Sequence, residues 1–273
     1  MRELAGKVAV VTGGGSGIGR GMALAFAEAG MHVALADVDR GAAEAVRQEV
    51  ERHRVRALVV ETDVLERDAV LELAARVYAE LGAAHVLCNN AGVVTFGEMH
   101  TLTDADWDWV LGVNLRGVVH GLQAFLPRMR AQAGPKHVVN TASIAGVAPY
   151  EGIGPYVASK YAVVGLSEAL RLEGAAWELG CTAVCPGNVR TRIVQSARNR
   201  HRELGGPHAV DNPEVQRQTD AGIDPEDVGR LVREAVQADR PYVFTHPENR
   251  VLVEERFAAM GAAFDVLDGA RRG

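Results

Sequence analysis

Several features that would place this chain in other protein classes are missing from its 273 residues. The formal net charge is −6 and no basic cluster accompanies aromatic residues, so a nucleic-acid partner is not expected. No apolar stretch reaches the ~18 residues that a membrane-spanning helix needs. The N-terminal segment MRELAGKVAVV enters a strand pattern directly and lacks the layout of a signal peptide. We therefore expect a cytoplasmic protein without a membrane partner.

Cysteine is also scarce, with Cys88, Cys181 and Cys185 as the complete set. Three cysteines cannot all pair with one another, and Cys88 lies in the apolar run AAHVLC. No histidine stands at ligand spacing from Cys181 and Cys185, so the sequence predicts no metal site there. Buried free thiols are the natural interpretation.

Lysine is rare for a chain with 29 basic residues, because only Lys7, Lys136 and Lys160 are lysines. Lys160 follows Tyr156 by four residues in YVASK, which places it one helical turn further along the same face. A free phenol has a pKa near ~10, so Tyr156 could act as a general base at neutral pH only if nearby cations stabilised its phenolate. Lysine supplies a compact point charge for this purpose, which the wide planar head of arginine does not. The pair therefore points to acid–base chemistry.

The rest of the sequence favours one α/β domain over residues 1–273, since 48% of the residues are hydrophobic and can form a sizeable core. Helix-patterned segments alternate with seven apolar runs, which are KVAVVT, HVALAD, ALVVETD, HVLCNN, HVVNTAS, CTAVCP and PYVFT. This order predicts a doubly wound, Rossmann-type fold with a seven-stranded, mostly parallel sheet and helices on both faces. Runs such as VAVV lack polar alternation, as expected for strands that are covered on both faces.

Two segments depart from this alternation. Residues 192–224 carry many turn residues and predict a long irregular loop, which we interpret as a substrate lid. Its basic run RNRHR, at 198–202, indicates either a solvated helix face or a loop near a ligand. Residues 245–273 predict an amphipathic helical extension at the C-terminal end.

A glycine-rich turn, TGGGSGIGR at 12–20, joins the first predicted strand to the first predicted helix. Gly13, Gly17 and Gly19 would let the backbone turn tightly and approach a diphosphate, which would rest on the amide groups at the helix N-terminus. The spacing is GxxxGxG, unlike the commoner GxGxxG, and an ordinary strand-to-helix loop is the alternative.

The second predicted strand ends in Asp37, 18 residues after Gly19. A carboxylate at this place can accept hydrogen bonds from the adenosine ribose and would repel a 2′-phosphate, which favours NAD over NADP. Neither Ser16 nor Val38 is basic, but Arg40 keeps NADP open as a less favoured cofactor. The alternative role of Asp37 is a helix cap.

The order of the motifs resembles the short-chain dehydrogenase/reductase family. The resemblance covers residues 5–191 and rests on TGGGSGIG, Asp63 in ETDV, NNAG at 89–92, Asn114 in VNLRG, Ser143 in TASIAG, YVASK and PGNVRT at 186–191. It implies a catalytic set of Asn114, Ser143, Tyr156 and Lys160, in which Ser143 holds the substrate oxygen and Asn114 anchors a water linked to Lys160. Without the ordered set, Ser143 would be interpreted as a turn cap and Asn114 as a hydrogen-bonding residue inside a helix.

The resemblance also implies which residues contact the cofactor and the substrate. The cofactor set is Gly13, Ser16, Gly17, Ile18, Gly19, Asp37, Asp63, Val64, Asn90, Ala91, Gly92, Tyr156, Lys160, Pro186, Gly187, Val189 and Thr191. The substrate set is Ser143, Val94, Phe96, Ala145, Pro149, Tyr150, Tyr156 and Val189, whose mostly apolar character predicts a hydrophobic secondary alcohol or its ketone. The basic lid residues Arg192, Arg198, Arg200, His201 and Arg202 could recognise a carboxylate or form a solvated charge run.

These inferences predict an NAD-dependent oxidoreductase for an alicyclic or aromatic secondary alcohol, in which Tyr156 is the general acid and base. One alternative is an NADPH-dependent reductase of carrier-linked 3-ketoacyl groups, against which Asp37 argues. An alternative from another class is a non-catalytic protein that senses a nucleotide or acts as a scaffold, against which the complete catalytic set argues. The resemblance implies a homodimer or homotetramer.

Overall fold

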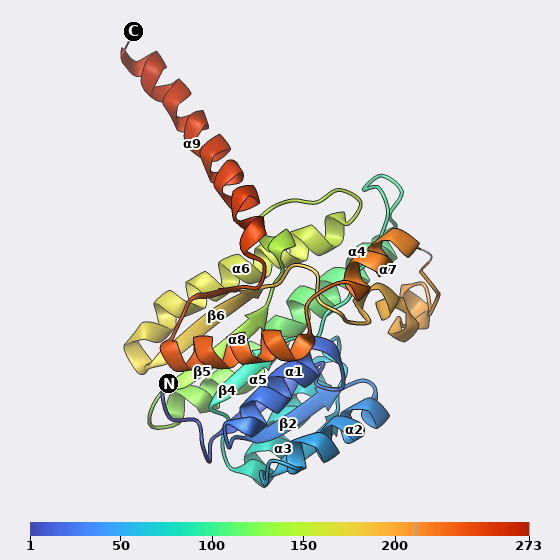
Figure 1. The fold of residues 1–273 in the computed structure, drawn as a ribbon, viewed down its shortest axis with the longest axis vertical. Helices are drawn as coiled ribbons and strands as arrows, with labels where there is room; N and C mark the ends of the chain where they lie inside the picture. The colour runs from blue at the N-terminus through green and yellow to red at the C-terminus, as the bar shows by residue number, and fades with distance from the viewer. Residues whose placement is uncertain (211, 273) are drawn as a thin grey trace.

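The computed structural model describes residues 1–210 and 212–272, and within them seven parallel strands form one sheet (Figure 1). The order across the sheet is β3-β2-β1-β4-β5-β6-β7. The strands are β1 (Val8–Thr12), β2 (His32–Asp37), β3 (Ala57–Glu61), β4 (Val86–Asn89), β5 (Lys136–Thr141), β6 (Leu179–Cys185) and β7 (Tyr242–Phe244). The predicted seven-stranded Rossmann-type sheet is confirmed, and every strand pairing is parallel.

Helices cover both faces of the sheet. They are α1 (Gly17–Glu28), α2 (Arg40–Glu51), α3 (Arg67–Leu81), α4 (Asp104–Leu111), α5 (Gly117–Ala131), α6 (Gly154–Gly174), α7 (Pro213–Asp220), α8 (Pro225–Ala238) and α9 (Arg250–Arg272). Alternate residues of each strand pack on opposite layers: Ala9 and Val11 of β1 join a core with α1, α2 and α8, whereas Val8 and Val10 join a core with α3, α5 and α6. This two-sided burial explains why the strands are apolar without alternation.

The parallel arrangement places the carboxyl ends of all strands at one edge of the sheet. From β1 the chain proceeds to β2 and β3 on one side, and then returns to β4 on the other side. The crevice at such a reversal is where doubly wound folds bind their ligands. The glycine-rich turn follows β1, and NNAG follows β4, so both motifs lie at this switch point.

The helical segment from Asp104 to Ala131 is not a continuous α-helix. Helix α4 passes through a π-helical turn over Gly112–Arg116 before α5 begins. The interruption contains Asn114, whose side chain bonds to the backbone of Val93. Single π turns of this kind often mark functional positions.

The predicted irregular lid is largely helical in the structure. Short 3₁₀ turns span Ile193–Asn199 and Arg202–Leu204, and α7 follows over Pro213–Asp220. Asn212 caps α7 by accepting a hydrogen bond from the Val215 amide at 3.2 Å, and Pro213 occupies the first turn, where its missing N–H is not needed. The prediction of a long irregular loop over residues 192–224 was therefore wrong for the helical parts of the segment.

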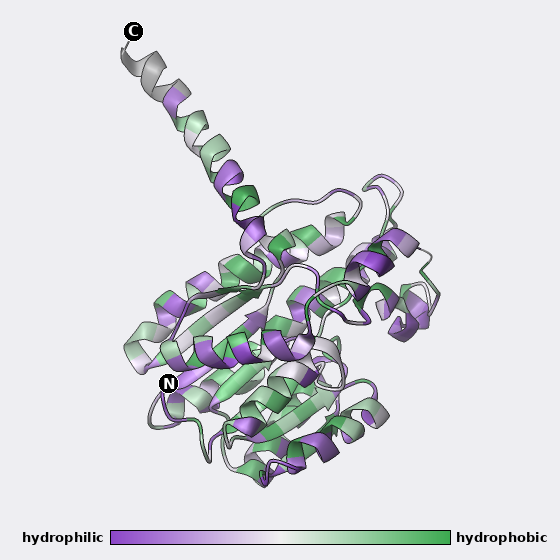
Figure 2. Cartoon of the chain, viewed as in Figure 1, coloured by the Kyte–Doolittle hydropathy of each residue, from purple (hydrophilic) through white to green (hydrophobic). Residues whose placement is uncertain are grey.

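Helix α9 extends away from the body of the molecule (Figure 1). Near its start Val253 packs against the core cluster around Val163 and Val164 of α6, whereas residues 257–265 are exposed, and Figure 2 shows hydrophobic and hydrophilic patches side by side along the helix. Phe257, Met260 and Phe264 are 58%, 48% and 69% exposed. No helix in the described residues is both long and apolar enough to cross a membrane.

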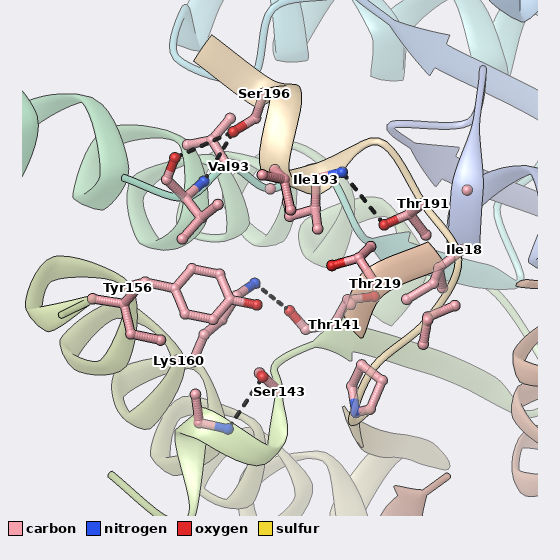
Figure 3. Close-up of a pocket in the computed structure, with 18 of the residues that line it drawn as sticks. Ile18, Val93, Thr141, Ser143, Tyr156, Lys160, Thr191, Ile193, Ser196 and Thr219 are labelled. Carbon is pink, nitrogen blue, oxygen red and sulfur yellow. Dashed lines mark hydrogen bonds between the residues drawn. The ribbon is translucent and has the colours of Figure 1, made fainter. Parts of the chain in front are cut away.

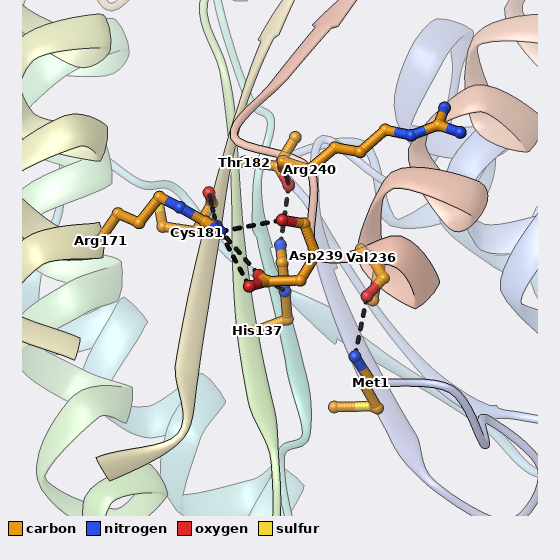
Figure 4. A network of polar contacts seen from close by, with 8 residues as sticks. All are labelled: Met1, His137, Arg171, Cys181, Thr182, Val236, Asp239 and Arg240. Carbon is orange, nitrogen blue, oxygen red and sulfur yellow. Dashed lines mark hydrogen bonds and ion pairs between the residues drawn. The ribbon is translucent and has the colours of Figure 1, made fainter. Parts of the chain in front are cut away.

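A polar network around the buried side chains of His137 and Thr182 lies away from the carboxyl ends of the strands (Figure 4). Nε2 of His137 lies 2.8 Å from Oγ1 of Thr182, and the Thr182 hydroxyl donates to the Arg240 carbonyl at 2.6 Å. Since the Thr182 proton is used there, Nε2 carries the imidazole proton and Nδ1 faces Asp239 at 3.7 Å without one. Burial lowers the pKa of His137 to about 3, so this imidazole is neutral.

The three cysteines are free and buried. Burial raises the pKa of the Cys181 and Cys185 thiols to about 12, which leaves both of them protonated and unreactive at neutral pH. No group of three acidic, histidine or cysteine residues within the described part of the chain could hold a metal ion.

Candidate active site

One cavity of about 830 Å³ opens at the carboxyl edge of the sheet and runs from the glycine-rich turn to Tyr156. Figure 3 shows Tyr156, Lys160 and Ser143 on one side of this space, with Ile193 and Thr219 of the lid across from them. The cavity therefore joins the predicted cofactor residues and the predicted catalytic residues in a single site.

The glycine-rich turn has the shape of a phosphate cradle. Gly13 and Gly17 have φ values of +64° and +52°, which residues with a side chain rarely adopt. At Gly19 a Cβ atom would lie 2.0 Å from the carbonyl oxygen of Gly13, so only glycine lets the helix approach the turn. The start of α1 then faces the cavity through Ser16 and Gly17. A diphosphate fits this place because free amide groups and the positive end of the helix meet there.

Asp37 closes β2 and faces the same end of the cavity. Its Oδ2 atom accepts a hydrogen bond from the Gly15 amide at 2.9 Å, and its Oδ1 atom accepts one from the Asp39 amide at 3.0 Å. The cap of α2 is Asp39, which accepts from the Ala42 amide at 2.9 Å. Asp37 is thus a cavity residue that also braces the glycine-rich turn, and the helix-cap alternative for Asp37 was wrong.

Asp63 lies further along the same side, next to Val64, and is covered by the lid. Oδ1 of Asp63 accepts from the Leu65 amide at 2.9 Å, while Oδ2 lies 2.7 Å from Nε2 of His201. Burial opposes the charged imidazole, but Asp63 and the nearby Glu203 outweigh it and raise the pKa of His201. The lid is therefore tied to the body at this end of the cavity.

Tyr156 and Lys160 project from the first turns of α6, which starts at Gly154 with Pro155 in its first turn. The ammonium nitrogen of Lys160 lies 5.4 Å from the centre of the Tyr156 ring and donates to the Thr141 carbonyl at 2.8 Å. Burial lowers the pKa of Lys160 to about 8. Burial also raises the pKa of Tyr156, although the neighbouring Ser143 hydroxyl acts to lower it. The expected lowering of the phenol pKa therefore has to come from the positive ring of an oxidised nicotinamide as well as from Lys160.

Ser143 follows β5 and is 7% exposed. Its Oγ atom accepts a hydrogen bond from the Ala145 amide at 3.1 Å, which caps the short 3₁₀ turn over Ile144–Gly146. The same hydroxyl lines the cavity close to the Tyr156 phenol. The hydrogen bond from Ala145 fixes the Ser143 oxygen and leaves the hydroxyl proton available to a ligand. Ser143 can therefore be both a turn cap and a site residue.

Asn114 is 1% exposed and lies behind the cavity wall. Its Oδ1 atom accepts from the Val93 amide at 2.8 Å, and its Nδ2 atom donates to the Val93 carbonyl at 2.9 Å and to Oγ of Ser159 at 3.1 Å. These bonds join the π turn to the segment after β4 and to the helix that carries Tyr156. The side chain of Asn114 thus positions two parts of the site, and its link to Lys160 through water stays a prediction.

Most of the residues predicted for the site line the cavity. They are Gly13, Ser16, Gly17, Ile18, Asp37, Asp63, Val64, Asn90, Ala91, Gly92, Val94, Phe96, Ser143, Ala145, Tyr150, Tyr156, Lys160, Pro186, Gly187, Val189 and Thr191. Gly19, Asn114 and Pro149 do not line it. Gly19 packs against the turn and Asn114 braces the wall, whereas Pro149 is exposed beside the mouth.

The lid contributes Ser196, which no sequence pattern indicated, and gives Arg200 a role that its charge run did not predict. Ser196 donates to the Val94 carbonyl at 3.3 Å and accepts from the Val94 amide at 3.1 Å. Arg200 is only 5% exposed, and its Nη1 atom lies 2.7 Å from Oδ1 of Asp106 while the guanidinium lies 5.0 Å from the Trp109 ring centre. The interpretation of RNRHR as a solvated charge run was therefore wrong for Arg200.

Comparisons with known proteins agree with this geometry. The family model for short chain dehydrogenases matches residues 7–202. A C alpha-dehydrogenase of Sphingobium sp. (strain NBRC 103272 / SYK-6) is 33% identical over 265 residues, which cover 95% of this chain and 87% of that protein. A short chain dehydrogenase/reductase from Burkholderia phymatum, solved in complex with NAD, superposes with a TM-score of 0.92 at 38% identity and covers 96% of this chain and 97% of its own.

A more distant structure, levodione reductase, has a TM-score of 0.76 at 26% identity over 88% of this chain and 96% of its own. The matched segment contains the glycine-rich turn, Ser143, Tyr156 and Lys160. The chain therefore belongs to the short-chain dehydrogenase family and is an NAD(P)-dependent oxidoreductase.

Proposed function

We propose that this enzyme interconverts a hydrophobic secondary alcohol and its ketone, with NAD as the cofactor and Tyr156 as the general acid and base. The observation that carries the proposal is the shared cavity, which has a phosphate cradle and Asp37 at one end and Tyr156 with Ser143 at the other. The bound nicotinamide would supply the hydride chemistry, accepting a hydride from the carbinol carbon or giving one to the ketone carbon.

In alcohol oxidation, the substrate hydroxyl proton passes to the Tyr156 phenolate as the carbinol hydrogen leaves as hydride. In ketone reduction, the Tyr156 phenol donates its proton to the carbonyl oxygen. The Ser143 hydroxyl donates a hydrogen bond to the same oxygen and so stabilises the charge that develops on it. Because burial raises the pKa of Tyr156, the resting phenol carries the proton that reduction needs, whereas oxidation requires nearby cations that stabilise the phenolate.

Lys160 has two tasks in this arrangement. Its position 5.4 Å from the Tyr156 ring centre lets the ammonium stabilise the phenolate, and its bond to the Thr141 carbonyl fixes that position. Burial lowers the pKa of Lys160 to about 8, which eases the onward transfer of a proton. Asn114 keeps α6 and the segment after β4 in register, so the distance between Tyr156 and the cofactor end of the cavity is preserved.

The substrate end of the cavity supports an apolar alcohol. Val94, Phe96, Ala145 and Val189 line it, and Ile193 of the lid faces it from the other side. Tyr150, which is 43% exposed, lies at the mouth. Such walls bind an alicyclic or aromatic skeleton through apolar contact and leave the oxygen to Ser143 and Tyr156. The names C alpha-dehydrogenase and levodione reductase, carried by two relatives, are compatible with this class of reaction.

The test begins with fluorescence titration of the purified protein with NADH and, separately, NADPH. Tighter binding of NADH supports Asp37 as the ribose ligand, while preference for NADPH favours a ketoacyl reductase. A panel of aromatic and alicyclic secondary alcohols with NAD⁺ then tests the substrate class. Tyr156→Phe should lower kcat by roughly 10³-fold or more with unchanged NADH binding. Tyr161→Phe, its neighbour outside the cavity, is the control and should keep normal turnover.

We also propose that the enzyme is a homo-oligomer in which α9 packs on a second copy of the chain. A helix with Phe257, Met260 and Phe264 exposed on one face is marginal in water without a partner. The double variant Phe257→Ser, Phe264→Ser should reduce the mass measured by light scattering to that of one chain. The control Ala258→Ser, Ala262→Ser adds as many serines without removing a large apolar side chain. An unchanged mass in the phenylalanine variant would contradict this role of α9.

A further inference from the structure

The first half of the lid carries two arginines whose charges are not neutralised by the protein. Arg192 and Arg198 line the cavity, and neither forms an ion pair within the described residues. Arg192 also lines an adjoining hollow of about 440 Å³ together with Arg20 and Arg190. These two are neutralised, Arg20 by Glu49 and Glu226, and Arg190 by Asp224. Arg20 and Arg190 are thus paired with carboxylates, whereas Arg192 and Arg198, which line the cavity, have no such partner among the described residues.

The backbone holds Arg198 in place. Its Nη1 atom donates to the Gln195 carbonyl at 3.0 Å and more weakly to the Arg192 carbonyl at 3.4 Å, which leaves the rest of the guanidinium fork for a ligand. The segment is fixed on both sides of Arg198, by the bonds of Ser196 to Val94 and by the buried pair of Arg200 with Asp106. Such a position suits a binding residue better than a mobile surface charge.

The charge around Arg198 also favours an anion. Burial and then the like charge of Arg192 lower the pKa of the Arg198 guanidinium, while Asp37 and Asp39 act in the opposite direction. An arginine remains charged under these conditions, so an anion that lies between the two side chains would relieve their mutual repulsion. The start of α1, with Ser16 and Gly17, lines the same cavity, and Ser16 and Gly17 share the adjoining hollow with Arg192.

We propose that Arg192 and Arg198 bind the diphosphate of the dinucleotide and thereby hold the first half of the lid over the cofactor. This inference rests on the proposed function. The forked guanidinium groups would contact the phosphate oxygens that point away from the α1 amides, so that the diphosphate is enclosed between the glycine-rich turn and the lid. The second half of the lid, with Asn212, Val215, Gln218 and Thr219 along the cavity, is left to the substrate side.

A 2′-phosphate on the adenosine ribose is the other anion that Arg198 could meet. Asp37 stands at the ribose position and would repel it. Arg192 borders Ser16 and Gly17 in both hollows, which places it at the diphosphate and not at the ribose. Arg192 therefore fits the diphosphate directly, and Arg198, which is influenced by the charges of Arg192, Asp37 and Asp39, would reach it from the ribose side.

The test compares Arg192→Gln, Arg198→Gln and their double variant with Arg202→Gln, an exposed lid arginine that does not line the cavity. NADH affinity is measured by fluorescence, and ADP-ribose and adenosine are then measured as competitors. Each single variant should bind NADH and ADP-ribose with an affinity lower by on the order of tenfold, and the double variant should show a larger loss. Adenosine, which has no phosphate, should bind as in the unsubstituted protein. Arg198→Lys should recover part of the loss, because it restores the charge without the fork.

The outcomes separate the inference from the proposed function. If the unsubstituted protein binds NADH and both glutamine variants bind it equally well, the diphosphate role is overturned while the proposed function stands. If the variants bind adenosine and ADP-ribose with equally reduced affinity, the diphosphate role is also overturned, since the lid would then act on the adenosine side. If Arg198→Gln loses affinity for NADPH alone, the diphosphate role is overturned as well, because Arg198 would then bind a 2′-phosphate. If the unsubstituted protein binds neither dinucleotide, both proposals fail.

Discussion

Asp37→Asn offers the sharpest test of cofactor choice, because it removes one negative charge with almost no change in shape. The carboxylate lines the cavity and already accepts the Gly15 and Asp39 amides at 2.9 and 3.0 Å. A 2′-phosphate at the ribose would lie about 5 Å from it, where two like unit charges repel each other by about 3 kcal/mol at an effective dielectric constant of about 20. That energy corresponds to roughly 100-fold discrimination against NADP.

The asparagine side chain keeps one acceptor oxygen, so one of the two amide bonds survives and the glycine-rich turn loses about 1 kcal/mol of support. NADH should therefore bind roughly tenfold more weakly, NADPH should bind more tightly, and the ratio of their dissociation constants should move by about 100-fold. Asp39→Asn is the matched control, since it removes the same charge two residues away and asparagine still caps α2. A ratio within threefold of the original in Asp37→Asn, or an equal change in both variants, would refute the reasoning.

Two further substitutions test the lid and the polar network around His137. Arg200→Gln leaves the Asp106 carboxylate without its buried partner, so we expect a loss of about 3 kcal/mol in the free energy of unfolding together with a higher KM. A calorimetric unfolding midpoint equal to that of Arg202→Gln would show that the pair of Arg200 with Asp106 does not hold the lid. His137 is neutral in the fold with a pKa of about 3 but titrates near 6.5 when unfolded, so its contribution is complete above pH 6.5 and is lost progressively as the pH falls towards 3. Between pH 7 and pH 5 this loss is about 2 kcal/mol. His137→Gln keeps a hydrogen-bond donor for Thr182 and should make the free energy of unfolding nearly independent of pH in this range. If the stability of the variant falls as steeply between pH 7 and pH 5, other groups cause the loss.

Local chemistry explains why much of the fold could be predicted from the sequence. Parallel strands buried on both faces must be apolar throughout, so runs such as VAVV and HVVN locate β1 and β5 without further information. The spacing of Tyr156 and Lys160 depends only on the pitch of one helix, and the φ values required at Gly13 and Gly17 depend only on the turn that contains them. These features need no knowledge of distant residues.

Other features depend on contacts between remote segments, and the sequence did not reveal them. The π turn at Gly112–Arg116 exists where Asn114 bonds both backbone groups of Val93, 21 residues earlier. Thr141 holds Lys160 through a backbone carbonyl, which has no side-chain signature at all.

The basic run at 198–202 shows this limit most clearly, because residues of similar charge take different roles. Arg200 meets Asp106 and becomes buried, His201 meets Asp63 and ties the lid beside Val64, and Arg198 meets no carboxylate and faces the cavity. The two carboxylates precede their partners by 94 and 138 residues, so the fold alone decides which cations are neutralised. The cation of this run that forms no ion pair with the described residues and lines the cavity is then the one available to a ligand, and that is why a charge run without a sequence signature can contain a binding residue.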